Sequence, residues 1–125
     1  MNDAPFFTLV AADSDVQAIF GTSPVRVYPF DYAVTKGDKL SKPYATFQLT
    51  GGLPANNLSD RPCSDSIDLQ VDIYGTTVAE TRAAANAIEY AIELDCQITR
   101  IMSESIEGAT KLYRTTFLTQ WFINR

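Results

Sequence analysis

Carboxylates are the side chains of this chain whose spacing could support chemistry, and two of them lie in the stretch SIDLQVDIYG, residues 66–75. The alternation in this stretch predicts a strand with two unlike faces. Asp68 and Asp72 lie on the polar face, roughly 13 Å apart along an extended chain, which is too far for them to share one metal ion unaided. Solvation, or pairing with an arginine of a neighbouring strand, is therefore their expected role. The other face carries only aliphatic side chains: Ile67, Leu69, Val71 and Ile73.

Few other residues could bind a metal. Asp60 and Asp65 do not have the spacing of a calcium loop, which needs a central glycine and a final glutamate. The two cysteines, Cys63 and Cys96, are too far apart for a close metal pair and are expected to be reduced thiols. The sequence predicts no metal site and no cofactor.

Enzymatic activity is disfavoured by the residue types that the chain lacks. It contains no histidine, which removes the usual general base near neutral pH and the commonest neutral metal ligand. The Gly-Gly pair at 51 and 52 is followed by Leu-Pro and by no Lys-Ser or Lys-Thr, so it does not form a phosphate-binding loop. We expect no catalytic residues and no nucleotide binding.

Charge and hydropathy limit the class of partner. Asp and Glu number 15 against 10 Lys and Arg, which gives a formal net charge of −5 and disfavours a grip on nucleic acid. The N-terminal sequence does not have the pattern of a secretion signal, and no stretch is apolar over the roughly 20 residues of a membrane span. We expect a soluble, unexported protein.

The order of predicted elements indicates one α+β domain over residues 1–125, since 46% hydrophobic residues can fill one core. We expect an antiparallel, mixed-order sheet of about five strands with two helices packed on one face. Asp13 to Asp15 allow a break or kink in the first helix, and Thr77 and Glu80 form a capping box at the start of the second. The predicted elements are a helix over 5–20, a strand over 25–30, a loop over 31–43, a strand over 44–50, a long loop over 51–65, a strand over 66–75, a helix over 77–94 and a hairpin of strands over 98–106 and 112–123.

The last predicted strand is apolar on both faces near its end. One face carries Tyr113, Phe117, Trp121 and Ile123, and the other carries Leu112, Leu118 and Phe122. A sheet covered on one side only should not place a tryptophan and a phenylalanine on opposite faces unless something else covers them. Burial under the first helix is one explanation, and contact with a second subunit is the one that we favour. The predicted subunit interface consists of Tyr74, Tyr113, Phe117, Trp121 and Phe122.

Several segments together resemble the small tail completion or tail terminator proteins of long-tailed bacteriophages and prophages. The similarity spans nearly the whole chain. No single segment is a diagnostic motif; the order and spacing of RVYP, PY and the strand ending in VDIYG carry the resemblance. The segments are LVAADSDVQAIFG, PVRVYP, KPYATFQ, DRP, SIDLQVDIYGTT, ITRIMSES and KLYRTTFLTQWF.

This resemblance implies a virion structural protein without catalytic activity. It implies a ring, usually of six copies, that sits on the head-proximal end of the tail tube, stops its polymerisation and contacts the head connector. The partners would then be copies of the chain itself, the tail tube protein and the connector or neck protein, with genomic DNA passing through without specific binding. Assembly would take place in the host cytoplasm, and no membrane is involved.

Within that interpretation, the surfaces can be assigned from the predicted elements. Acidic side chains on the open sheet face, Asp68 and Asp72, would line the channel and repel DNA, although acidity could equally serve only to keep the subunit soluble. The two long loops would contact the tube or the connector. Their candidate contact residues are Tyr32, Lys36, Lys39, Leu53, Asn56, Asn57, Leu58 and Arg61.

Two other functions remain open on the sequence, and an enzyme ranks below both; turnover that falls on replacing Asp68 or Asp72 would support it. One is a head-completion or neck protein beneath the portal, which would bind the connector instead of the tail tube. The other is a non-viral module that binds a peptide or protein and stays monomeric.

Overall fold

The computed structural model describes residues 4–22, 25–29, 42–54, 64–106 and 112–124. Within these ranges a five-stranded sheet has the order β1-β2-β3-β5-β4. All neighbouring pairs are antiparallel except β1 and β2, which are parallel. The strands are β1 (Val27–Pro29), β2 (Tyr44–Pro54), β3 (Ser64–Gly75), β4 (Gln97–Ile106) and β5 (Tyr113–Asn124). The predicted α+β class and strand number are confirmed.

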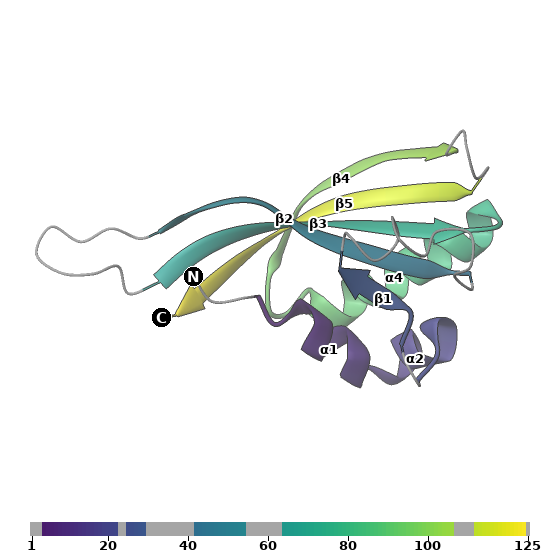
Figure 1. The fold of residues 1–125 in the computed structure, drawn as a ribbon, viewed down its shortest axis with the longest axis horizontal. Helices are drawn as coiled ribbons and strands as arrows, with labels where there is room; N and C mark the ends of the chain where they lie inside the picture. The colour runs from purple at the N-terminus through teal and green to yellow at the C-terminus, as the bar shows by residue number, and fades with distance from the viewer. Residues whose placement is uncertain (1–3, 23–24, 30–41, 55–63, 107–111, 125) are drawn as a thin grey trace, which may run out of the picture.

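Three helices lie on one side of the sheet (Figure 1): α1 (Phe6–Ala12), α2 (Ser14–Phe20) and α4 (Val78–Ile92). The core forms between this layer and the aliphatic face of β3, whose alternate residues from Ile67 to Ile73 are buried as predicted. α4 contributes a stripe of small and branched residues to the same core, namely Thr81, Ala84, Ala85, Ile88 and Ile92. Small side chains allow the helix to lie close to the sheet. None of the described helices is long and apolar enough to cross a membrane.

The first predicted helix is two helices, separated at the break that Asp13 to Asp15 were expected to allow, so three helices of the described residues cover the sheet instead of two. Asp13 has extended backbone angles, and its side chain accepts hydrogen bonds from the amides of Asp15 and Val16 at 2.9 and 3.1 Å. A side chain that bonds to the amides ahead of it caps a new helix, which is why α1 stops and α2 starts here.

The long loop predicted over 51–65 is wrong at both of its ends, which lie in strands. β2 continues to Pro54 despite Gly51, Gly52 and Pro54, with a bulge between Leu49 and Gly51. β3 already begins at Ser64. Gly52 approaches the neighbouring strand so closely that an added Cβ would clash with the carbonyl oxygen of Ser66. Glycine here permits close strand approach instead of marking a loop.

The predicted cap of α4 is present with one difference. The Thr77 hydroxyl accepts a hydrogen bond from the Glu80 amide at 3.1 Å, as expected. The Glu80 carboxylate, however, accepts from the amide and hydroxyl of Thr76 at 3.4 and 3.0 Å. The reciprocal bond therefore reaches one residue further back than in a standard capping box.

Candidate assembly surfaces

The face of the sheet that points away from the helices is the first candidate surface. On it, Asp72 lies between Thr46 of β2 and Thr116 of β5. Asp72 is only 8% exposed, because its carboxylate accepts hydrogen bonds from the Thr116 hydroxyl and from the Gln70 side-chain amide, the latter at 3.2 Å. The expectation that Asp72 lies bare on this face is therefore wrong. Asp68, which is half-buried, keeps more contact with solvent.

Aromatic side chains gather at one end of this open face. The rings of Tyr44 and Tyr74 are stacked with centroids 4.9 Å apart, and the Tyr28 ring lies 6.3 Å from that of Tyr44. Leu112 packs against the same group. Tyr74, one of the predicted interface residues, is thus half-buried within the chain itself.

The last strand separates the predicted interface residues by face. Phe117 and Trp121 are buried in the core under the helices, with Trp121 only 1% exposed. Their predicted exposure to a second subunit is wrong, because the chain's own helices cover that face of β5. Phe122, on the opposite face, is 66% exposed and is available for an intermolecular contact.

Phe122 belongs to an extension of the sheet. β4 pairs with β5 only as far as Gln97 opposite Gln120, so β2, β3 and β5 continue beyond it as a three-stranded end (Figure 1). There Leu53 and Phe122 flank Ser66 on neighbouring strands. Leu53 is 75% exposed and lies in β2, not in the loop where it was expected. We call Leu53 and Phe122 the apolar tip.

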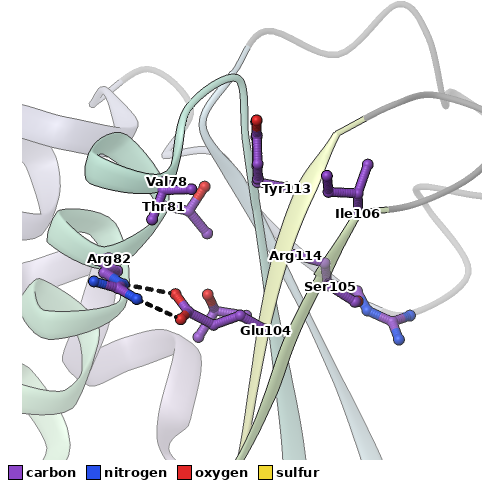
Figure 2. A pocket seen from close by; sticks show the side chains of 9 residues that line it. Val78, Thr81, Arg82, Glu104, Ser105, Ile106, Tyr113 and Arg114 are labelled. Carbon is purple, nitrogen blue, oxygen red and sulfur yellow. Dashed lines mark hydrogen bonds and ion pairs between the residues drawn. The ribbon is translucent and has the colours of Figure 1, made fainter.

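A groove lies at the other end of the molecule, between the first turns of α4 and the ends of β4 and β5 (Figure 2). Val78 and Thr81 face Tyr113 and Ile106 across it, whereas Arg114 points away toward the other side of the sheet. The groove has a volume of about 220 Å³. We call it the α4–β4 groove, and its lining consists of Val78, Thr81, Arg82, Glu104, Ser105, Ile106, Tyr113, Arg114 and Thr115.

An ion pair joins the two walls of this groove. Arg82 of α4 donates two hydrogen bonds to the Glu104 carboxylate of β4, from Nε at 2.8 Å and from Nη2 at 2.7 Å. These hydrogen bonds lower the pKa of Glu104 and raise that of Arg82. On the far side of the ion pair, a second hollow lies between α4 and Ile101 of β4, and Glu89 lines it. The pKa of Glu89 is raised, mainly by burial and to a lesser degree by the nearby Glu93.

The thiol of Cys96 is also accounted for by its surroundings. Its Sγ donates to the Ile92 carbonyl at 3.4 Å, and burial, followed by the nearby Asp95, raises its pKa to about 11. Such a thiol is a poor nucleophile and a poor metal ligand at neutral pH. Among the described residues, no three acidic or cysteine side chains form a group that could hold a metal ion.

Most of the predicted loop contacts lie outside the described residues: Tyr32, Lys36, Lys39, Asn56, Asn57, Leu58 and Arg61. The α4–β4 groove, in contrast, was not anticipated from the sequence. Arg82 and Glu104 are 22 positions apart, and no periodic pattern links them. The available signal was the pair of isoleucines at 101 and 106, which are exposed on the outermost strand.

Comparisons with known proteins give one family match and a structural match. The family model described as tail completion protein gp17 matches residues 4–123. Among solved structures, a chain from a virion of a native gene transfer agent particle has the same fold, with a TM-score of 0.75 and 15% sequence identity. The alignment covers 96% of this chain and 92% of that one. No curated protein matches the sequence.

Proposed function

Because this chain belongs to the tail completion protein gp17 family and is thus a component of a phage-like tail, we propose that it forms a ring on the head-proximal end of the tail tube. The ring of six copies stops tube polymerisation and provides the surface to which the head connector binds. The observation that carries this proposal is the family match, which spans nearly the whole chain.

The arrangement of the surface supports an assembly role. Helices cover one face of the sheet, and large apolar side chains are exposed at both ends of the long axis, at the apolar tip and beside the α4–β4 groove (Figure 1). Exposed apolar groups of this size are typical of surfaces that bind other proteins.

The charge of the subunit is compatible with passage of DNA. Six copies at −5 each give −30 for the ring, and any part of that charge facing the channel repels phosphates. Asp68 is the better of the two predicted channel residues, because Asp72 is already hydrogen-bonded and buried.

Binding to separated virion parts tests the proposal. The purified chain is mixed with tail-tube cylinders in one experiment and with isolated head connectors in another, and complexes are imaged by electron microscopy. We expect a ring on one end of each cylinder, and cylinders capped during assembly should stop growing. Binding to connectors alone would instead identify a head-completion protein, and binding to neither would contradict an assembly role.

A further inference from the structure

We propose that copies of this chain associate head to tail, with the apolar tip of one copy seated in the α4–β4 groove of the next. The inference rests on the proposed function, since it specifies which surfaces form the ring. It commits to a second copy of this chain as the occupant of the groove.

The apolar tip has the properties of an inserting element. Leu53 and Phe122 are among the most exposed large apolar side chains of the described residues, and they lie side by side across Ser66. The three strands that carry them extend past the end of β4, so the tip projects from the body of the molecule (Figure 1). Removing such a side chain from water favours association, and the isolated chain does not gain this stabilisation.

The groove has the properties of a receiving element. Its rim carries two more exposed apolar side chains, Val78 of α4 and Ile106 of β4. The Arg82–Glu104 pair connects the two walls within the chain itself, so the groove is present before any partner arrives (Figure 2). A preformed site loses less entropy on binding than one that must be ordered first.

Charge favours the same pairing of ends. Arg114 lies at the end of the sheet that carries the groove but points toward the open face, where it is exposed and has no ion pair among the described residues. Asp68, on the face that carries the tip, likewise has none. Head-to-tail contact brings the end of one copy that carries Arg114 toward the end of the next copy that carries Asp68, so opposite charges approach each other.

The position of the two surfaces determines the type of assembly. The tip and the groove are different surfaces, and the strand ends that carry them lie at opposite ends of the longest axis (Figure 1). Such a contact is heterologous, so an open chain of subunits keeps one free tip at one end and one free groove at the other until the ring closes. Subunits joined in this way form a ring when the rotation between neighbours closes, whereas a self-complementary contact stops at a dimer.

Two double variants test the pairing. The tip variant carries Leu53→Asn and Phe122→Asn, and the groove variant carries Val78→Asn and Ile106→Asn. A matched control, Tyr90→Asn with Leu94→Asn, replaces two exposed apolar side chains near the C-terminal end of α4 and just beyond it, neither of which belongs to the tip or lines the groove. Circular dichroism and thermal unfolding verify that each variant is folded.

Analytical ultracentrifugation gives the readout, with and without tail-tube cylinders. We expect each of the two variants to lower the association constant by about tenfold to hundredfold, and the control to assemble like the wild type. Mixing the tip variant with the groove variant should give a dimer and nothing larger, because one intact tip and one intact groove remain between them.

The outcomes separate this inference from the proposed function. If the wild type forms rings and either variant assembles equally well, or if the mixture of variants stays monomeric, the tip-in-groove contact is wrong and the ring remains. If the wild type itself stays monomeric even with cylinders, the ring and the contact both fail.

Discussion

At the scale of single residues, two threonines on the same face of β5 illustrate how context decides the role of one side chain. The Thr119 hydroxyl donates to the Leu69 carbonyl at 3.1 Å and accepts from the Trp121 indole at 2.8 Å. The Thr115 hydroxyl is also buried but has no hydrogen-bond partner among the described residues. A buried polar group stabilises a fold only when its hydrogen bonds are made.

The two positions should therefore respond oppositely to the same substitution. We expect Thr119→Val to lower the free energy of unfolding by about 1 to 3 kcal/mol, because it leaves the Trp121 indole N–H without its acceptor. Thr115→Val removes a hydroxyl that bonds to nothing and should leave stability unchanged or raise it. Urea denaturation followed by tryptophan fluorescence measures both, and an equal loss in the two variants would contradict this account.

At the scale of elements, β5 supplies the core with one face and the surface with the other. Trp121 and Phe122 are neighbours in sequence, yet one is buried and the other exposed. Trp121→Ala should cost about 3 to 5 kcal/mol of stability, since it leaves a cavity under the helices. Phe122→Ala should change stability by no more than about 0.5 kcal/mol. Chemical denaturation measures both changes in the free energy of unfolding. A small loss in Trp121→Ala would mean that the helices repack and fill the cavity.

The connection between α4 and β4 depends on pH through Glu104. Arg82 lowers the pKa of Glu104 in the folded chain, so the stability that this pair contributes is present above the ordinary range for glutamate and is lost as the pH falls through the lowered value. Glu104→Gln should therefore flatten the acid side of the stability profile. The pKa of Glu89 is raised mainly by burial, so stability depends on this residue in the opposite direction. The stability associated with its protonated form is lost as the pH rises.

A comparison of these two variants tests the sign of each effect. Thermal unfolding is measured between acidic and neutral pH for the wild type, Glu104→Gln and Glu89→Gln. Glu89→Gln should gain stability relative to the wild type as the pH approaches neutrality, whereas Glu104→Gln should lose it. Parallel profiles for all three proteins would show that neither carboxylate is linked to folding.

At the scale of the whole molecule, net charge opposes association while apolar contact favours it. Each copy carries a net charge of −5, so two copies repel each other at long range. This repulsion exceeds the attraction of one exposed pair, Arg114 with Asp68, which contributes under about 1 kcal/mol. Self-association should therefore strengthen between about 0.1 M and about 1 M NaCl, where screening shortens the range of the repulsion. Sedimentation velocity measures the shift, and weaker association in high salt would indicate that ion pairs dominate the contact.

The sequence by itself determined the elements whose signals are local. The alternation of residues 66–75 predicted β3 and its buried face, and Thr77 with Glu80 predicted the start of α4. Asp13 marked the break in the first helix because an aspartate caps through amides only two and three residues ahead. These signals act between near neighbours along the chain, so no knowledge of packing is needed to interpret them.

Only the tertiary structure decided which surfaces are free. The two faces of β5 are equally apolar in sequence, and the helices, which come from distant parts of the chain, bury Trp121 and leave Phe122 exposed. The sequence alternation predicts that Asp72 is exposed, but in the structure the hydroxyl of Thr116, 44 residues away, donates a hydrogen bond to its carboxylate. The α4–β4 groove likewise exists only because α4 and β4 lie side by side. Burial depends on contacts between distant segments, and sequence periodicity does not record which segments meet.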